Sequence, residues 1–310
     1  MTSTASVLAV ALAAVGALFF GLASVRQHRA VRATAAPARS TWWEQVVAGL
    51  RLVRQPAWLL GAGQAGLGGL LHVVALTLAP IPLVQPVGVL AVPVTVFAAA
   101  LARRRRPAPP QVLGSVLSVV GVAALTVVLL LPAAQPATLP TFAHLAVGTG
   151  AVLVGGGAVA LLLGGTWAPA VLRCLSRAVV AAALFGLNSV LIRTLGEVVV
   201  APTAALIGLV VTALVGIALA LPLGVWAMQS AYRFGSPQVV ICCLTLIDPL
   251  TAVVGGRLLL QDGASVTGSA LAAALACALV AAAGVVMLAR DYPVEAAPEL
   301  ATIDRPAAGT

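Results

Sequence analysis

The sequence predicts an all-α polytopic membrane protein with about nine transmembrane helices. Of its 310 residues, 61% are apolar and only 8% are charged. A soluble protein cannot hide so much apolar surface, because its exterior must face water. The apolar residues also form continuous stretches of about 20 residues, which cross a bilayer as helices and lack the alternation of a membrane barrel.

Nine apolar segments of suitable length follow one another along the chain. They cover residues 4–25, 57–79, 83–102, 111–132, 141–163, 177–196, 203–232, 238–260 and 266–289. The seventh segment is long and contains Pro222, so it forms either one kinked helix or two shorter ones. The first segment lacks the basic residues that precede the apolar core of a signal peptide, and we expect it to be retained.

Two stretches outside these segments have a different character. Residues 41–55 combine two tryptophans and other apolar residues with Arg51 and Arg54, which predicts an interfacial amphipathic helix. Residues 291–310 are rich in Pro, Ala and Glu, and we expect a disordered cytoplasmic tail.

The basic residues predict how the helices are oriented. All 17 are arginine, and with the N-terminus outside only Arg193 and Arg257 fall near outer ends. The inner ones are Arg26, Arg29, Arg32, Arg39, Arg51, Arg54, Arg103, Arg104, Arg105, Arg106, Arg173, Arg177, Arg233, Arg290 and Arg305. This excess predicts an outer N-terminus and an inner C-terminus, and it explains the net charge without a nucleic-acid partner. The run from Arg103 to Arg106 is interpreted as a topology anchor, with binding of anionic lipid as the alternative.

Two short sequences recur in the same order in both halves of the chain. Residues 20–25 read Phe-Gly-Leu-Ala-Ser-Val, and residues 185–190 read Phe-Gly-Leu-Asn-Ser-Val. Residues 93–95 read Pro-Val-Thr, and residues 249–251 read Pro-Leu-Thr. The arginine-based orientation gives the matched segments opposite directions, as in the inverted repeats of secondary transporters. Chance similarity between helices of low complexity is the alternative explanation.

The recurrence divides the chain into two inverted four-helix units. We expect the first unit in residues 1–132, a connecting helix in residues 133–170 and the second unit in residues 171–290. The apolar segments place the protein in the cell (cytoplasmic) membrane as a multi-pass protein. Its composition, rich in alanine and with arginine as the sole basic residue, favours a GC-rich bacterium.

Further motifs lie in the second and third segments. Residues 66–68 are Gly-Leu-Gly, residues 78–80 are Leu-Ala-Pro, and residues 83–88 are Leu-Val-Gln-Pro-Val-Gly. Together with the helix layout over roughly residues 5–290, they resemble the drug/metabolite transporter superfamily, and within it the EamA/NIPA-like magnesium transporter branch. The resemblance implies a transporter of two inverted repeats.

The chain departs from this branch at acidic positions. The glutamate that the branch typically carries after its Gly-x-Gly is replaced by Gly69. Asp262 resembles the acidic residue that often ends the penultimate helix of the superfamily, but its counterpart in the first half is Arg106. The resemblance therefore implies the fold more directly than it implies magnesium as the substrate.

Asp248 is the first candidate for a coupling or cation-binding group. It is the one carboxylate well inside an apolar segment, where burying a polar group is costly, and it directly precedes Pro249. Pro249 has no N–H to donate to the carbonyl of Thr245, so the helix loosens there. The Asp248 carboxylate and the freed carbonyl beside it could together form a cation site, or the carboxylate could bind a proton. Alternatively, Asp248 forms a structural ion pair with an arginine such as Arg193.

Other polar residues of the segments are weaker candidates. His72 could titrate near neutral pH, although a lone histidine often only donates to a carbonyl. Four amides would line a cavity if they face one another, and otherwise they join helices by hydrogen bonds. These amides are Gln64, Gln85, Asn188 and Gln229. Expected helix breaks lie at Pro93 and Thr95 and, in the matched segment, at Pro249 and Thr251.

These features favour a secondary transporter that moves a small polar or amphipathic metabolite across the inner membrane by alternating access. The alternatives are a NIPA-like transporter of divalent cations, a flippase for a lipid-linked carrier and a non-transporting membrane partner of an envelope complex. The sequence contains no enzymatic motif, so we expect neither an enzyme nor a cofactor. Expected partners are a small-molecule or ion substrate and membrane lipids, and a homodimer is one option for assembly.

Overall fold

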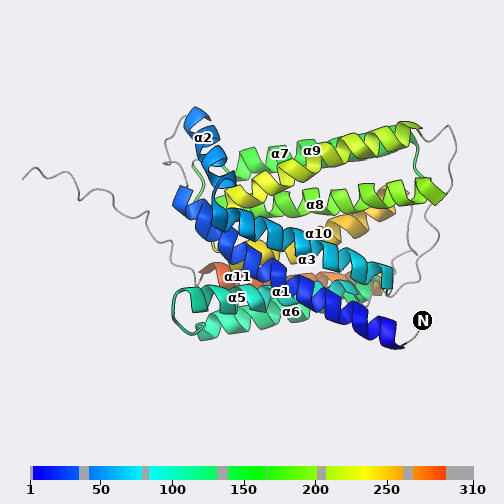
Figure 1. Cartoon of the computed structure of the whole chain (residues 1–310). Coiled ribbons are helices and arrows are strands. Elements are labelled where there is room, and N and C mark those ends of the chain that lie inside the picture. Colours follow the sequence, from blue (N-terminus) through cyan, green and yellow to red (C-terminus); the bar gives the residue numbers. More distant parts are fainter. Residues whose placement is uncertain are drawn as a thin grey trace, which may run out of the picture.

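The computed structural model describes residues 3–34, 42–78, 84–130, 139–165, 167–200, 207–260 and 268–290. Within these ranges every regular element is a helix. Figure 1 shows the helices lying side by side as a bundle, with the connections at its two ends. The predicted all-α polytopic membrane fold is thereby confirmed.

The helices follow the predicted segments closely. They are α1 (Ser3–Thr34), α2 (Trp42–Val53), α3 (Pro56–Leu78), the 3-10 helix η1 (Gln85–Leu90), α5 (Ala91–Ala102), α6 (Pro109–Leu130), α7 (Phe142–Leu163), α8 (Ala170–Val200), α9 (Ile207–Tyr232), α10 (Pro237–Leu260) and α11 (Gly268–Arg290). In the described part of the chain, eight helices are long and apolar enough to cross a membrane. The seventh predicted segment is one helix, because α9 continues through Pro222.

The third predicted segment is not a regular membrane helix. It begins as η1, with a proline in its first turn, and continues as the 12-residue helix α5. Its apolar helical part, Val87–Ala102, is shorter than the eight long helices. A 3-10 helix rises more steeply per residue than an α-helix, so η1 and α5 together still reach about 30 Å, the thickness of the hydrocarbon core.

Large apolar side chains cover the outside of the bundle. Leu101 and Leu161 are each 77% exposed, and Val154 is 74% exposed. Water would solvate such a surface poorly, whereas lipid tails are as apolar as these side chains. The surface is therefore the one expected of a bundle embedded in a bilayer.

Glycines allow the closest helix contacts. A Cβ on Gly16 of α1 would lie 2.9 Å from the carbonyl oxygen of Gly68 in α3, and a Cβ on Gly68 would lie 2.9 Å from that of Gly16. Gly114 of α6 and Gly284 of α11 approach each other in the same reciprocal way. Small residues at such crossings let the backbones pack directly, which is how membrane helices commonly associate.

The recurring sequences form equivalent helix crossings in the two halves. A Cβ on Gly21 of α1 would lie 2.5 Å from Cγ1 of Val94 in α5. A Cβ on Gly186 of α8 would lie 2.6 Å from the carbonyl oxygen of Asp248 and from Cβ of Thr251 in α10. In Figure 1, α1 runs opposite to α8, and α5 runs opposite to α10. In each half, the Phe-Gly-Leu helix thus crosses the Pro-x-Thr helix at its glycine.

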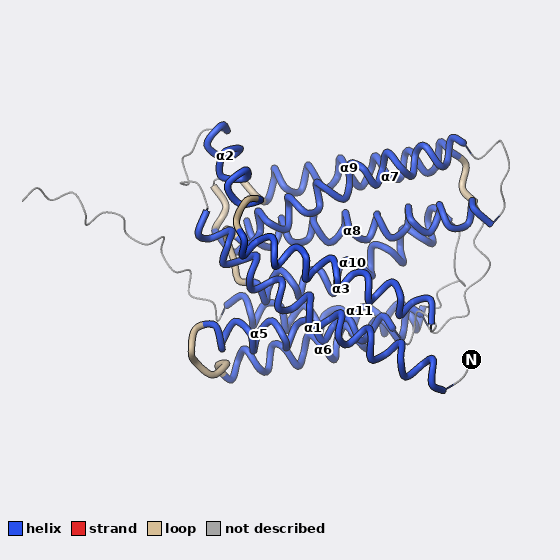
Figure 2. The backbone as a smooth tube through the Cα atoms, in the orientation of Figure 1, coloured by secondary structure: helices blue, strands red, loops and turns tan. Residues whose placement is uncertain are grey.

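Figure 2 shows several short connections at one end of the bundle, on the left, where α1, α5, α9 and α11 end and α8 begins. Most described arginines lie in or beside these helix ends. We call this the arginine-rich end. It comprises Arg26, Arg29, Arg32, Arg103, Arg104, Arg105, Arg106, Arg173, Arg177, Arg233 and Arg290. The side of the membrane that this end faces, like the division into two inverted units, stays a prediction.

Candidate functional site

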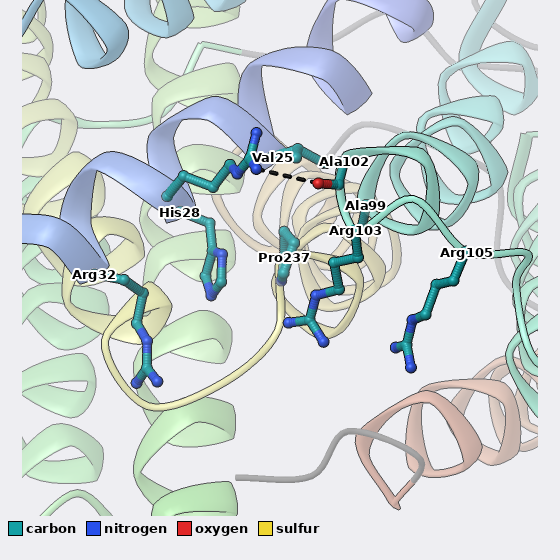
Figure 3. A pocket seen from close by; sticks show the side chains of 9 residues that line it. Val25, His28, Arg32, Ala99, Ala102, Arg103, Arg105 and Pro237 are labelled. Carbon is teal, nitrogen blue, oxygen red and sulfur yellow. Dashed lines mark hydrogen bonds between the residues drawn. The ribbon is translucent and has the colours of Figure 1, made fainter. Parts of the chain in front are cut away.

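A pocket opens at the arginine-rich end between α1, α5 and the start of α10. Its volume is about 530 Å³, and we call it the arginine pocket. It is lined by Val25, His28, Arg29, Arg32, Ala99, Ala102, Arg103, Arg105 and Pro237. Figure 3 shows the side chains of His28, Arg32, Arg103 and Arg105 turned toward the same space.

One wall of the arginine pocket is a single face of α1. Val25, His28, Arg29 and Arg32 follow the spacing i, i+3, i+4 and i+7, which repeats along one side of an α-helix. The predicted membrane segment ends at Val25, but α1 continues to Thr34 because arginine and alanine are strong helix formers. The polar wall is therefore a rigid extension of a membrane helix.

Two arginines of this wall bind the carboxyl ends of neighbouring helices. The Arg29 Nη2 donates to the carbonyl oxygen of Ala102, the last residue of α5, at 3.2 Å. The Arg32 Nη1 donates to the carbonyl oxygen of Arg233, directly after α9, at 3.1 Å. Terminal carbonyls have no partner within their own helix and carry partial negative charge, so both contacts are favourable. They hold α1, α5 and α9 together around the pocket.

The opposite wall is shaped by the turn that ends α5. The backbone N–H of Arg105 donates to the carbonyl of Ala100 at 3.1 Å, and that of Arg104 donates to Leu101 at 2.9 Å. This is the Schellman pattern, whose left-handed position usually holds glycine. Here Arg104 occupies it with φ 52°. Arg103 and Arg105, on either side, both line the pocket.

A buried polar cluster lies beside the pocket, between α1 and the end of α9. The Gln229 Nε2 donates to Oε1 of Gln27 at 2.9 Å, and the Tyr232 hydroxyl donates to Oγ of Ser24 at 3.0 Å. The ring of His28 meets the ring of Tyr232 edge to face, with centroids 6.0 Å apart. The cluster thus connects the first half of the chain to the second at the arginine-rich end.

Positive charge is concentrated around this end. The guanidinium carbons of Arg173 and Arg177 lie 4.1 and 4.6 Å from the centre of the Phe234 ring. Burial and, to a lesser extent, the charge of Arg173 lower the pKa of Arg233. Like charges disfavour one another's charged form, so the arginine-rich end is a favourable location for an anion.

Asp248 lies half-buried in α10, at the crossing with Gly186. Neither Arg193 nor any other described residue forms an ion pair with it. Groups of three or more His, Cys, Asp or Glu that could hold a metal ion are also lacking in the described ranges. Asp248 thus forms no ion pair among the described residues.

α10 continues from Pro237 to Leu260 through Pro249, so the helix is not interrupted there, and a bend at Pro249 stays a prediction. One missing hydrogen bond is tolerated when the turns on both sides stay intact. Pro93 lies in the first turn of α5, directly after η1, where a proline is better tolerated than in the middle of a helix. The Thr95 hydroxyl donates to the carbonyls of Ala91 at 2.7 Å and Gly21 at 3.4 Å, so it joins α5 to α1.

The expected amide-lined cavity stays a prediction, and the described amides have separate surroundings. Gln229 belongs to the polar cluster, and the Asn188 Nδ2 donates to the carbonyl of Leu184 in its own helix at 2.8 Å. Gln64 is half-buried and does not line the arginine pocket, and the side chain of Gln85 lies outside what the structure describes. Gln229 thereby joins α9 to α1, as the alternative expected.

The remaining predicted positions also lie away from the arginine pocket's lining. His72 is half-buried in α3, with its Cε1 4.0 Å from the Cβ position of Gly88 in η1. Asp262 and the tail of residues 291–310 lie outside the described residues.

The polar wall of α1 was not among the predicted sites. Hydropathy ends the first segment at Val25, so His28, Arg29 and Arg32 read as a connection rather than a helix. Their helical spacing from Val25 is the signal that could have revealed a polar face continuing the membrane helix.

Comparisons of this chain with family models, curated proteins and solved structures find no match. The structural features that bear on its function are the two helix crossings, the polar cluster and the arginine pocket.

Proposed function

We propose that this multi-span membrane protein is a secondary transporter that moves a small polar or amphipathic substrate by alternating access. The observation that carries the proposal is the equivalence of the crossings at Gly21 and Gly186. They lie in helices of opposite direction, as in transporters built from two inverted repeats. The resemblance to the drug/metabolite transporter superfamily supports the same function.

The arginine pocket lies where such a movement would open or close a path. Its walls come from α1 and α5 of the first half and from Pro237, at the start of α10, in the second. Rocking of one half against the other would change the width of this space. The hydrogen bond between Gln27 and Gln229 spans the same boundary. Such bonds contribute only about 0.6 kcal/mol on average within membranes, so they can break reversibly.

Asp248 is the coupling residue of this proposal. It lies at the crossing of α8 with α10 and forms no ion pair with a described residue. A carboxylate in this position can change its protonation or bind a cation as the two halves move. The substrate gradient or an ion gradient would then drive transport.

Distances between spin labels test alternating access without knowledge of the substrate. One pair, Ala33→Cys with Trp167→Cys, joins the first unit to the loop directly before α8 at the arginine-rich end, and Val7→Cys with Ile207→Cys spans the two halves at the other end. Val7, Ile207 and Trp167 are each about two-thirds exposed, and Cys277, the native cysteine that is not buried, is replaced by Ala. We expect two distance populations in each pair, with matching fractions. One narrow population at both ends would contradict the proposal and favour a non-transporting membrane partner.

Magnesium flux separates the divalent-cation alternative. The full chain is reconstituted in liposomes with a magnesium indicator, and Asp248→Asn is the control variant, with the same volume and no charge. Transport of a metabolite predicts no magnesium flux in the wild type. Flux that Asp248→Asn abolishes would instead support a cation transporter, and flux unchanged in this variant would remove the role assigned to Asp248.

A further inference from the structure

We propose that α2 docks on the anionic lipid surface beside the bundle, in the leaflet at the arginine-rich end. The inference goes beyond transport, because a helix bound to lipid in this way anchors the neighbouring ends of α1 and α3 whether or not a substrate is carried. It rests on the distribution of apolar and basic side chains around α2 and on the position of this helix in the fold.

One side of α2 is apolar and exposed. Trp43 is 57% exposed, Leu50 is 51% exposed and Val53 is 44% exposed. These residues follow the spacing i, i+7 and i+10, which keeps them on the same side of an α-helix. Water solvates such a surface poorly, so this side favours contact with an apolar environment.

The opposite side of α2 is held by the bundle. Leu52 is half-buried and packs against the hydrophobic core. Two positions separate it from Leu50, which places the two side chains about 200° apart around the helix axis. The bundle therefore covers the side of Leu52, and whatever covers the side of Leu50 must approach from outside the bundle.

The position of α2 matches the boundary between lipid and water. Figure 1 shows α2 at the arginine-rich end, running across the direction of the long helices rather than along them. The membrane helix α3 begins shortly after it, and its first turns carry Leu59 and Leu60, which are 52% and 64% exposed. Lipid that covers these leucines lies close to α2 along the chain. Tryptophan, present here as Trp43, is enriched at this depth of a membrane.

Basic side chains flank the apolar side. Arg51 directly follows Leu50 and Arg54 directly follows the end of α2, and both are exposed. With Glu44, also exposed, they leave this segment with a net positive charge. Basic residues at a membrane surface are attracted by anionic lipid, and guanidinium groups form charge-assisted hydrogen bonds with phosphates. Apolar residues with arginines beside them are typical of helices that bind a lipid surface.

A second copy of the chain matches this side of α2 less well. A stable protein interface contains roughly 20–30 residues from each partner. The described part of α2 offers three large exposed apolar side chains. In a twofold dimer built on this side, Arg51 and Arg54 would also lie close to the same arginines of the other copy, and like charges repel. An anionic lipid surface accepts both the apolar side chains and the arginines.

Spin labels test where the two sides of α2 lie. Leu50→Cys reports the apolar side, Arg51→Cys is the matched control on the adjacent flank, and Leu161→Cys is the reference for lipid because Leu161 is 77% exposed on α7. Each is made with Cys277→Ala, and the full chain is reconstituted in bilayers of phosphatidylglycerol and phosphatidylcholine. Oxygen concentrates in lipid, whereas a neutral nickel chelate stays in water. We expect oxygen to relax the labels at Leu50 and Leu161 and the nickel chelate to relax the label at Arg51.

Local quenching tests the preference for anionic lipid. A fluorophore attached at Leu50→Cys is quenched by brominated phosphatidylglycerol or by brominated phosphatidylcholine in bilayers of otherwise equal composition. We expect phosphatidylglycerol to be about fivefold enriched beside the fluorophore. Arg51→Gln with Arg54→Gln should remove most of this enrichment. Arg104→Gln with Arg106→Gln, the same change in net charge outside α2, should preserve it.

Circular dichroism and size-exclusion chromatography establish that each variant is intact, and Arg51→Gln alone is the substitute if the first double variant does not fold. The proposal is overturned if the nickel chelate relaxes the label at Leu50, because this side then faces water. Shielding of that label from both reagents would also overturn it, in favour of a protein partner. Equal quenching by the two lipids, or a preference that the Arg51/Arg54 variant retains, would refute recognition of anionic lipid by α2. Failure of the distance test of transport would leave these results unaffected.

Discussion

Gln229 in α9 donates a 2.9 Å hydrogen bond to Gln27 in α1, although the two residues are 202 positions apart in the chain. Both side chains are buried. The bond joins the two halves of the chain beside the arginine pocket, and Tyr232 and Ser24 form a second bond between the same two helices. The contact between the halves at this end is therefore polar as well as apolar.

A double-mutant cycle should detect the bond between Gln27 and Gln229. Gln27→Ala and Gln229→Ala each remove one partner, and the double variant removes both. We expect a coupling free energy of about 0.6 kcal/mol, and at most about 1.7 kcal/mol, the range found for side-chain hydrogen bonds within membranes. The measurement is unfolding in mixed micelles with increasing sodium dodecyl sulfate.

Asn188→Ala combined with Gln27→Ala is the matched control, because the Asn188 amide bonds within its own helix. This pair should show no coupling. A coupling of zero between Gln27 and Gln229 would mean that the bond does not hold α1 and α9 together.

The repeated glycines should tolerate no side chain. At Gly21 an added Cβ would lie 2.9 Å from the carbonyl oxygen of Ala91, and at Gly186 it would lie 2.6 Å from that of Asp248. The crossing helices must separate to relieve these contacts. We therefore expect Gly21→Ala and Gly186→Ala each to lower the free energy of unfolding by about 1–3 kcal/mol, as in other overpacked cores.

Gly63→Ala in α3 serves as the control for this prediction, because an added Cβ there meets no atom within 4 Å. Alanine also has the higher helix propensity, so this variant should be neutral or slightly stabilised. If Gly21→Ala were as stable as Gly63→Ala, the two helices would not pack closely at the repeated glycine.

Most of the fold could be predicted because membrane helices follow hydropathy. Apolar length alone located the long helices, including α9, and the two tryptophans with Arg51 and Arg54 located α2. Hydropathy reports solvent preference and not helix ends, so it missed the extension of α1 to Thr34. It also could not separate η1 from α5, because that change depends on local backbone geometry.

The candidate site was less predictable for a different reason. The intramembrane polar residues of the sequence indicate Asp248 and the four amides, but the Asn188 amide bonds within its own helix and Gln229 pairs with Gln27. The arginine pocket instead combines residues of α1, α5 and α10 that are far apart in sequence. In the sequence, the arginines among them indicate only membrane topology. The three-dimensional structure is needed to show that they line one pocket.

Arg104→Gly should stabilise the turn after α5. Arg104 has φ 52°, which an L-residue adopts at a cost and glycine adopts readily. The greater freedom of glycine in the unfolded chain offsets part of the gain, so we expect the free energy of unfolding to rise by about 0.5–1 kcal/mol. Arg106→Gly, outside the left-handed position, is the control and should bring no gain. Equal effects of the two substitutions would show that the turn is not strained.

The arginine-rich end should face the cytoplasm, because positively charged segments remain on that side during insertion. Single cysteines at Arg106, in the loop after α5, and at Ile207, the first residue of α9, report the two ends of the bundle. Cys277→Ala removes the native cysteine that is not buried. In intact cells, a membrane-impermeant maleimide should label Ile207→Cys and should label Arg106→Cys only after the membrane is permeabilised. The reverse pattern would invert the topology and place the arginine pocket on the outer surface.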